Sequence, residues 1–387
     1  MLALTGTGAM AADSMTSEKS RPIAAWSDVF ISGTGSEVPP VVETEIAIAQ
    51  GRIERQVAES TDIVSAAVSS MSAPEMASRA ARSLSRMYHR DLADVALLIH
   101  ATAWDQQHLA APQYIQAALG MCVPMAFELR HGCAGGLTAL AVAAQHLVAN
   151  PADTVLVTAA DRFTEPAFDR WRSASGLIHG DGAAAAMLTR GRGFAALRSF
   201  AAASAPAYEM TGRTAALMTG GSGETLDAIP TKRRLISTIG RAELVADLAQ
   251  HTTDTVTAAL HAAHLEFRDI DHIVVPHLGR KTLDAFFFTP MAAQWKASTW
   301  DFGRTVGHTG PADTLLGLDY LACTGALDPG QHVLAFGIGT GFCWSSAVIE
   351  IIDTPATADH RPTEPERAGD LPPSEFQLSS RLIGRLP

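Results

Sequence analysis

Short runs of β-branched and other apolar residues alternate with longer alanine-rich stretches over residues 27–352. Continuous apolar runs are typical of strands buried on both faces, and the alanine-rich stretches between them are typical of helices that cover such a sheet. This pattern predicts an α/β protein with a largely parallel sheet. The predicted strands are 28–33, 95–102, 126–129, 154–160, 183–189, 193–203, 272–276, 332–337 and 345–352. The predicted helices are 74–86, the stretch from Cys133 to residue 149, 241–264 and 314–323.

The order of these elements repeats, because each half has a long helix, a strand, a further helix and a closing pair of strands. Such a repeat predicts an internal duplication with halves at 27–205 and 206–352. Residues 1–26 are rich in Ala, Ser, Thr and Gly, a composition that predicts a mobile leader. Residues 353–387 are dense in Pro, Glu, Arg and Ser, which predicts an extended tail.

Composition narrows the classes of protein to which this chain can belong. Apolar residues make up 47% of the chain and charged residues 18%, which indicates a globular protein. The formal net charge of −11 gives no general attraction to nucleic acids or anionic membranes, so neither is an expected partner. The four cysteines are too dispersed for a disulfide scaffold or a C-x-x-C metal site, which favours a reducing cytoplasm. No secretory signal pattern and no apolar run approaching about 18 residues is apparent in the sequence.

Cys133 is the first candidate for chemistry. It lies in E-L-R-H-G-C-A-G-G, after a predicted strand and at the start of a predicted helix. Backbone N–H groups and the helix dipole favour a thiolate at such a position, and the flanking glycines permit a tight turn. The alternative is a small buried hydrophobic residue, which is how most free cysteines behave.

Three later segments carry further candidates. His277 ends the run V-V-P-H, at the carboxyl end of a predicted strand where α/β proteins bind ligands. His308 and Asp313 lie in the loop G-H-T-G-P-A-D that opens a helix, where Asp313 taken alone could simply cap the helix. The segment F-G-I-G-T-G-F at 336–342 is either a plain hairpin or a turn that presents a backbone N–H to an oxyanion.

Taken in order, five motifs resemble the thiolase superfamily, specifically the β-ketoacyl-ACP synthase III-like enzymes, over about 28–352. They are C-A-G-G, H-G-D-G-A-A-A-A-M-L from His179 to Leu188, V-P-H, G-H-T-G, and P-G-Q-H-V-L-A-F-G-I-G-T-G-F-C-W. The resemblance implies the thiolase-like duplicated five-layer αβαβα fold, a homodimer, and acylation of Cys133 by a thioester. It also implies an oxyanion hole formed by the backbone N–H groups of Cys133 and Thr340. No bound cofactor or metal is implied, and the co-substrate is an acyl thioester on acyl carrier protein or CoA.

The sequence departs from the family pattern at the site. Counting back from P-G-Q, the family's active-site asparagine falls on His308, so the Cys-His-Asn set is absent. A Cys-His-His set resembles the elongating ketoacyl synthases, which implies decarboxylative carbon–carbon bond formation. The pattern G-H-x-G-x-x-D, which ends at Asp313, resembles a divergent acyltransferase branch of secondary metabolism that uses Cys-His-Asp to esterify sugars or other alcohols.

Physical chemistry favours the second reaction. Condensation needs neutral or positive donors where the enolate charge develops, which a carboxylate opposes. Transfer to an alcohol needs a general base, and a carboxylate beside that base stabilises the imidazolium that forms. We therefore expect His277 to be the base, Asp313 to orient it and His308 to be a secondary donor. A hydrolase or lactone-forming enzyme would keep the same residues, whereas a non-catalytic relative would typically lose the cysteine.

The sequence also indicates the acyl donor and the contact between subunits. Relatives that use CoA often carry W-x-x-x-R, and residues 60–76 lack both Trp and Arg, which favours acyl carrier protein as donor. Arg280 and Lys281 are the expected carrier contacts, the cluster 232–234 being an alternative, and Leu109 is expected to contact substrate or carrier. The strand near 154–160 is expected at a sheet edge, where a second copy of the chain would pair with it.

Overall fold

The computed structural model of the chain describes residues 21–105, 110–212 and 227–355. The strands are β1 Arg21–Ala25, β2 Val29–Glu37, β3 Val41–Glu43, β4 Ser65–Ala67, β5 Val95–Ala101, β6 Met125–Leu129, β7 Thr154–Asp161, β8 Gly182–Arg190, β9 Ala195–Ser204, β10 His272–Val274, β11 His332–Gly339 and β12 Cys343–Ile351. The α-helices are α1 Thr44–Ala49, α2 Arg55–Thr61, α3 Ala73–Met87, α4 Ala111–Leu119, α5 Gly135–Ala149, α7 Ile229–Ile239, α8 Arg241–Ala262, α9 Arg280–Leu283, α10 Thr289–Met291, α11 Trp300–Val306 and α12 Asp313–Cys323. Each predicted strand and helix is found, with ends shifted by a few residues.

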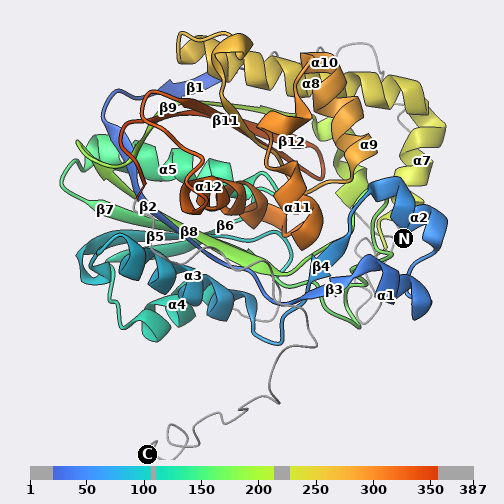
Figure 1. Cartoon of the computed structure of the whole chain (residues 1–387), viewed down its shortest axis with the longest axis horizontal. Coiled ribbons are helices and arrows are strands. Elements are labelled where there is room, and N and C mark those ends of the chain that lie inside the picture. Colours follow the sequence, from blue (N-terminus) through green and yellow to red (C-terminus); the bar gives the residue numbers. More distant parts are fainter. Residues whose placement is uncertain (1–20, 106–109, 213–226, 356–387) are drawn as a thin grey trace, which may run out of the picture.

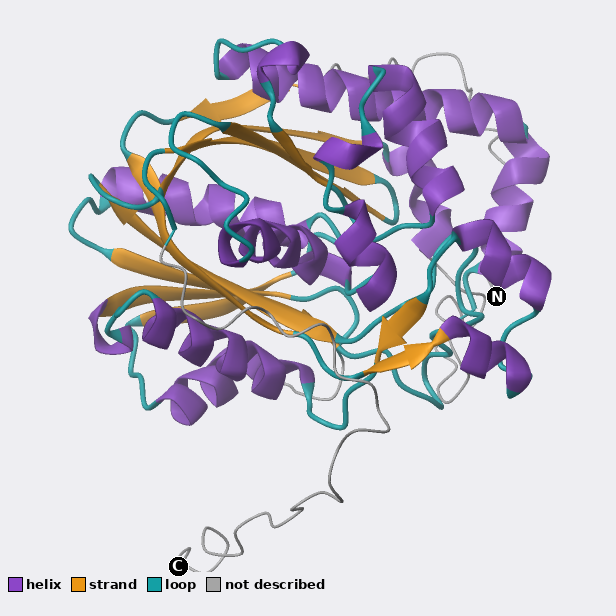
Figure 2. Cartoon of the chain, viewed as in Figure 1, coloured by secondary structure: helices purple, strands orange, loops and turns teal. Residues whose placement is uncertain are grey.

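These elements stack in five layers (Figure 1). Helices α3 and α4 cover the outer face of one sheet, α5 and α12 lie between the two sheets, and α8 covers the outer face of the second. The strand order is β10-β11-β12-β9-β2-β8-β7-β5-β6, and β2 meets β9 only at Phe30 and Ile31, where the two sheets join (Figure 2). The expected five-layer αβαβα fold is confirmed.

The predicted boundary between the halves differs from the structure. Strand β9 pairs with β12 along most of its length, so the second sheet already includes residues before 206. The expected leader also ends earlier, because β1 pairs with β9 and the neighbouring Trp26 is buried. The short run R-P-I-A-A gave little signal of its own, since its pairing partner lies far along the chain.

The expected sheet edge is also corrected. Strand β7, which covers the predicted strand 154–160, pairs with β5 on one side and β8 on the other, and it is almost fully buried. Among the described strands β6 ends this sheet instead, and none of its side chains is fully buried. An apolar run buried on both faces is the signature of a central strand, which explains the composition of β7.

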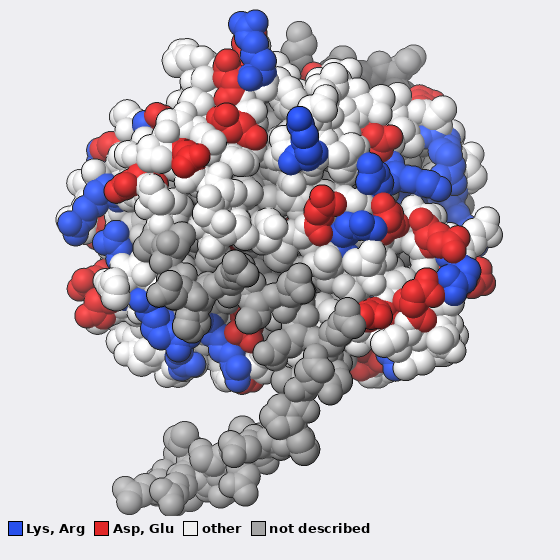
Figure 3. Space-filling model, viewed as in Figure 1, with Lys and Arg blue, Asp and Glu red and all other residues white. Residues whose placement is uncertain are grey.

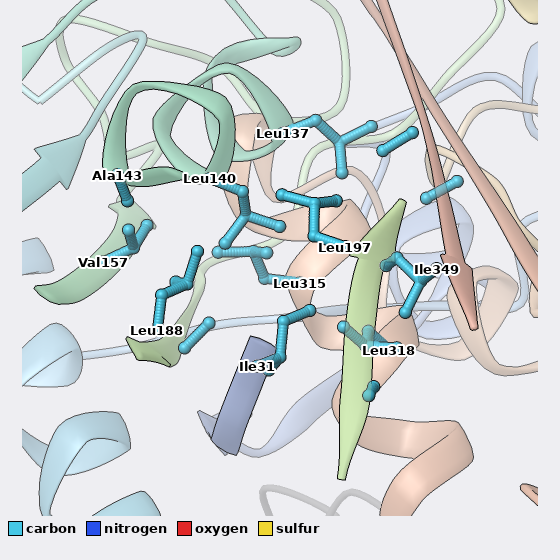
Figure 4. Close-up of a cluster of buried hydrophobic side chains, with 14 of the residues drawn as sticks. Ile31, Leu137, Leu140, Ala143, Val157, Leu188, Leu197, Leu315, Leu318 and Ile349 are labelled. Carbon is cyan, nitrogen blue, oxygen red and sulfur yellow. The ribbon is translucent and has the colours of Figure 1, made fainter. Parts of the chain in front are cut away.

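The central layer carries the main core. Figure 4 shows apolar side chains of α5 and α12 meeting those of the flanking strands. The labelled residues are Leu137, Leu140 and Ala143 of α5, Leu315 and Leu318 of α12, and Ile31, Val157, Leu188, Leu197 and Ile349 of the strands. The window Gly132–Ala149 has mean hydropathy 1.4 and is long and apolar enough to cross a membrane, unlike what the sequence analysis expected, but 56% of it is buried inside the protein. Its apolar composition follows from its place between two sheets.

Close packing of α5 against the loop before α12 gives a test of this arrangement. A Cβ atom at Gly136 would lie 2.2 Å from the carbonyl oxygen of Pro311. We expect Gly136→Ala to lower the free energy of unfolding by about 1–3 kcal/mol, because a rigid backbone atom must move. Urea denaturation measures this change. The control Arg86→Ala, at an exposed position of α3, should stay within about 0.5 kcal/mol of wild type, and equal stability of the two variants would contradict the described packing.

Candidate active site

Cys133 lies in the tight turn between β6 and α5. Gly132 adopts a positive φ of 52°, a conformation that glycine reaches without strain. The turn lies against β11, where a Cβ at Gly339 would be 3.1 Å from the Cys133 nitrogen and a Cβ at Gly337 would be 3.3 Å from the Ala134 Cα atom. The glycines of β11 therefore allow the partly exposed Cys133 to approach that strand closely.

His308 enters the site from a loop of the second half. Helix α11 ends at Val306, and Gly307 with φ 82° turns the chain. His308 then forms a short parallel bridge, in which its N–H donates to Ile178 O (2.8 Å) and its carbonyl accepts from Gly180 N–H (3.0 Å). This bridge fixes the backbone of His308 to the first half of the chain.

A line of hydrogen bonds joins the cysteine to the carboxylate. His308 Nε2 lies 3.0 Å from Cys133 Sγ, and His308 Nδ1 lies 2.5 Å from Asp313 Oδ2. Since an ionised carboxylate only accepts hydrogen bonds, Nδ1 carries the proton that faces Asp313. Nε2 is then the nitrogen that exchanges a proton with the thiol. This order of thiol, imidazole and carboxylate matches the arrangement of a nucleophile, its base and the group that orients the base.

Asp313 is 1% exposed and accepts four hydrogen bonds. Besides His308 Nδ1, the donors are His277 N–H at 2.8 Å and the backbone N–H and hydroxyl of Thr309, each at 2.7 Å. None of them is a first-turn N–H of α12, so Asp313 does not serve as an ordinary helix cap. Burial acts to raise the pKa of Asp313, but His277 and His308 together lower it below its usual range.

The charge state of His308 follows from these neighbours. Burial acts to lower the pKa of His308, but the Asp313 charge, the Cys133 charge and the hydrogen bonds to both raise it well above its ordinary value. An imidazolium at this position stabilises a thiolate at Cys133 and retains a proton that it can deliver to a leaving group.

The structure corrects the role expected for His277. Its ring is fully buried and contacts Asp313, with Nδ1 at 3.3 Å from Oδ1, but within the described residues no hydrogen bond joins the ring to Cys133. Packing against α11 fixes the ring, since a Cβ at Gly303 would lie 2.5 Å from its Cδ2 atom. The position beside the thiol, expected for His277, is occupied by His308. Both segments reach the same carboxylate, and the order of motifs in the sequence does not distinguish them.

The tautomer of His277 limits what its ring can donate. Nδ1 lies 3.0 Å from Gly307 O, which accepts a proton from it, and Nε2 has no partner among the described residues. Burial, the largest effect, lowers the pKa of His277 although Asp313 opposes it, so the ring is neutral near pH 7. A neutral ring with its proton on Nδ1 has only a lone pair at Nε2.

The expected oxyanion hole remains a prediction that the geometry supports. Strands β11 and β12 form a hairpin, and Thr340 lies in its turn. A Cβ at Gly132 would be 3.5 Å from the Thr340 nitrogen, so this N–H lies beside the turn that holds Cys133. The segment is therefore a hairpin that can also present a backbone N–H to an oxyanion, so the two interpretations of the sequence do not exclude each other.

The expected carrier contacts lie on the surface of the second half. Arg280 and Lys281 are exposed at the start of α9, and the Arg280 guanidinium lies over Trp295 (4.6 Å) and Trp300 (5.2 Å). In the alternative cluster, Lys232 donates to Ser175 O. Figure 3 shows basic and acidic side chains interspersed on the viewed face. Leu109 lies outside the described residues, so its expected contact is untested.

Sequence reasoning assigned no role to His179, which the structure places beside the site. Its ring centroid is 5.4 Å from that of His308. Near it, Arg170 and Asp181 form a buried bidentate ion pair at 3.0 Å. The signal was present in the motif H-G-D-G, where a polar His179 precedes a buried carboxylate, but the spacing alone did not relate it to His308.

The two stacked sheets and the cysteine turn between β6 and α5 define a protein of the thiolase superfamily. The family model for the C-terminal part of 3-oxoacyl-(acyl carrier protein) synthase III matches residues 260–351, and the model for the preceding part matches residues 127–205. A solved structure titled ChlB3, an acyltransferase, is 33% identical, with a TM-score of 0.81, and covers 86% of this chain and 100% of its own. The chain belongs to the synthase III family, and the likeness extends to its divergent branch.

Two relatives and one further structure have lower identities. A β-ketoacyl-(acyl carrier protein) synthase III of Vesicomyosocius okutanii is 26% identical over 333 residues, which cover 83% of this chain and 98% of the relative. The synthase III of Rhizorhabdus wittichii is 28% identical over 329 residues, which cover 82% and 98%. A structure of OleA from Xanthomonas campestris, at 18% identity, covers 84% of this chain and 99% of its own with a TM-score of 0.67 and shares the fold.

The line from Cys133 to Asp313 predicts how thiol reactivity depends on the carboxylate. We expect Asp313→Asn to lower the pKa of His308, because the charge that holds its proton is lost. The imidazolium is then lost at a lower pH as pH rises, so the positive charge beside Cys133 Sγ is weaker near neutrality. The rate of Cys133 alkylation by iodoacetamide at pH 7 should fall on the order of 10- to 100-fold, since one pKa unit is a factor of ten.

Asp319, a second buried carboxyl on α12, offers a matched control. Asp319→Asn should leave the alkylation profile between about pH 5 and pH 9 unchanged, because no contact joins Asp319 to His308 in the described residues. An Asp313→Asn variant that alkylates like wild type over this range would show that the carboxylate does not control the thiol.

Proposed function

We propose that this chain is an acyltransferase of secondary metabolism that moves an acyl group from a carrier-protein thioester, through acyl-Cys133, to the hydroxyl of a small-molecule acceptor such as a sugar. The single observation that carries this proposal is the line Cys133–His308–Asp313 at 3.0 and 2.5 Å. The 33% identity to a structure titled as an acyltransferase supports it. No metal or redox chemistry is needed for either half of the reaction.

In the first half-reaction the Cys133 thiolate attacks the thioester carbonyl. The negative charge of the tetrahedral intermediate would be stabilised by the backbone N–H groups of Cys133 and Thr340. When the carbon–sulfur bond to the carrier breaks, the proton on His308 Nε2 passes to the leaving thiolate. The products are acyl-Cys133, a free carrier thiol and neutral His308.

In the second half-reaction neutral His308 accepts the proton of the acceptor hydroxyl at Nε2. The hydroxyl oxygen attacks the acyl carbon, and the bond to Cys133 Sγ breaks to regenerate the thiolate beside an imidazolium. Asp313 stabilises that imidazolium and keeps the Nδ1 proton in place throughout, as in hydrolases with a triad. Each half-reaction therefore transfers one proton, and the transfer takes place at His308 Nε2.

The hydrogen-bonding states of His277 and His308 are less suited to decarboxylative condensation. Decarboxylation of an extender unit builds enolate charge that needs hydrogen-bond donors. His277, the second histidine of a Cys-His-His set, presents a lone pair at Nε2 because Gly307 O binds its Nδ1 proton. His308 can donate only as an imidazolium, and Asp313 lies directly beside it.

The donor and the compartment form part of the proposal. An acyl carrier protein would contact the exposed Arg280 and Lys281, since carrier proteins are acidic. All four cysteines are free, including the exposed Cys122, which fits a reducing cytoplasm.

Two histidine variants and CO₂ release decide between transfer and condensation. After loading from acyl-pantetheine thioesters, discharge of acyl-Cys133 to an alcohol should slow by on the order of 10² to 10⁴ in His308→Ala, because the general base is lost. His277→Asn, which keeps a donor for Gly307 O, should slow it by less than about tenfold, since this residue acts only through Asp313. Intact mass follows the acyl group, and trapped CO₂ reports decarboxylation of malonyl thioester.

Cys133→Ala is the loading control for this experiment. It should take up no acyl group, and an adduct on Cys122, Cys323 or Cys343 would refute the assignment of the nucleophile. Stoichiometric CO₂ release coupled to ketone formation would refute acyl transfer and establish condensation.

A homodimer through β6 is the second part of the proposal. Within the described sheet β6 has no strand on its outer side, so its backbone donors and acceptors there are available to a second copy. Its first residue, Met125, is 47% exposed, and α5, which follows the cysteine turn, exposes Val142 and Val148. An apolar surface beside an open strand edge suits an isologous contact.

A charged substitution on β6 tests whether the dimer forms through this strand. Met125→Lys should convert a dimer to a monomer at micromolar concentration in light scattering, because each copy would then place a charged ammonium group in the apolar contact. Ile46→Lys, on α1 at a similar exposure of 46%, is the control and should leave the dimer intact. A wild-type monomer, or a Met125→Lys dimer as tight as wild type, would rule out pairing through β6.

A further inference from the structure

A third histidine, His179, faces His308 from the first half of the chain. The ring centroids are 5.4 Å apart, and the backbone on either side of His179 is bonded to that of His308 through Ile178 O and Gly180 N–H. The backbones from which the two rings extend are therefore held together by the fold. His179 is 7% exposed, and neither half-reaction described above uses it.

The surroundings of His179 are suited to an apolar ring. Phe163 and Phe168 pack against it, with centroids at 4.4 and 4.6 Å. A phenyl group would fill this enclosure without any polar atom. The imidazole instead leaves Nδ1 buried and without a partner among the described residues. A buried polar atom in that state lowers stability by about 1–3 kcal/mol, so its retention requires a reason outside packing.

The neighbouring ion pair does not supply that reason. Arg170 makes a bidentate pair with Asp181, and its guanidinium also donates to the backbone carbonyl of His179 (3.5 Å). The Asp181 carboxylate further accepts the N–H groups of Ser69 and Phe163 at 2.8 Å. This network holds the backbone around His179 and leaves the imidazole side chain out of it.

The pKa values of His179 and His308 are shifted in opposite directions. Burial first, and then the positive charges of His308 and Arg170, lower the pKa of His179 well below its ordinary value, although Asp313 opposes them. The pKa of His308 is raised. Adjacent groups whose pKa values are driven apart are suited to different tasks. A neutral imidazole has one N–H donor and one lone pair, and it can bind a hydroxyl without competing for the proton that His308 removes.

We propose that His179 binds the reacting hydroxyl of the acceptor and holds it against His308. The proposal rests on the acyl-transfer function proposed above. The ring centroids of His179 and His308 lie 5.4 Å apart, and a single hydroxyl oxygen can make two hydrogen bonds of about 2.8 Å each, so one hydroxyl placed between the two rings can contact both.

The test separates acceptor binding from loading. Wild type and variants are acylated at Cys133 with the acyl-pantetheine thioester that loads fastest and are freed of donor. Discharge is then followed by intact mass in water alone and in rising concentrations of ethanol, glycerol or methyl glucoside. In His179→Phe, loading and discharge to water should stay within about threefold of wild type, because the ring shape is kept. The alcohol-dependent rate should fall about tenfold, as expected for one lost hydrogen bond, and the fall should appear in the acceptor KM.

Two further variants isolate the hydrogen bond. His179→Gln keeps a donor and an acceptor and should recover part of the alcohol-dependent rate that His179→Phe loses. His251→Phe makes the same change at another buried histidine, one that stacks on Trp344 at 4.7 Å, and should behave like wild type in all three measurements.

The outcomes are distinguishable. If alcohols discharge wild-type acyl-Cys133 faster than water and His179→Phe reacts with them as fast as His251→Phe, the acyl-transfer function stands and the role of His179 is overturned. Equal losses of loading, water discharge and alcohol discharge in His179→Phe would also overturn it, since they indicate a packing role. If none of the alcohols discharges the wild-type acyl-enzyme faster than water, the proposed function fails and this inference fails with it.

Discussion

The burial of one carboxylate, Asp313, is the constraint on which the site depends. Taking an ionised group out of water is strongly unfavourable unless donors surround it. Here four donors come from the chain after β10, from the ring of His308 and from Thr309. Satisfying one charge therefore fixes two segments, the chain after β10 and the loop at 308–309, against the start of α12. The assembly of the second half and the orientation of His308 are consequences of the same set of contacts.

The reacting thiol comes from the other half of the duplication. Cys133 precedes α5 and Asp313 begins α12, and these two helices share the central layer between the sheets (Figure 1). Their N-terminal ends approach so closely that Gly136 has no room for a side chain against Pro311. The 3.0 Å contact from His308 to Cys133 is thus set by packing between the halves. Stability of the central layer and reactivity of the thiol are coupled for this reason.

The sequence predicts the fold well because the elements that form it are long and regular. Buried strands such as β5, β7 and β8 have continuous apolar runs, and the ordered motifs identify the family. The sequence does not reveal which distant segments pack against each other. The order of His277 and His308 along the chain does not say which ring faces the thiol, and an apolar run does not say whether its strand is central or at an edge. Both depend on how distant segments pair, as does the short strand β1.

The position of each proton decides which reaction the site can perform. Gly307 O binds the Nδ1 proton of His277 and Asp313 binds the Nδ1 proton of His308, and His308 Nε2 lies beside Cys133 Sγ, where it can exchange a proton with the thiol. One exchangeable proton is sufficient for addition to and elimination from an acyl carbon, where a base and an acid act in turn. Stabilising an enolate requires donors that stay protonated while the charge develops. A histidine at the position where the family has asparagine, bonded to a carboxylate, therefore places a base beside the thiol, which is the arrangement that the proposed acyl transfer needs.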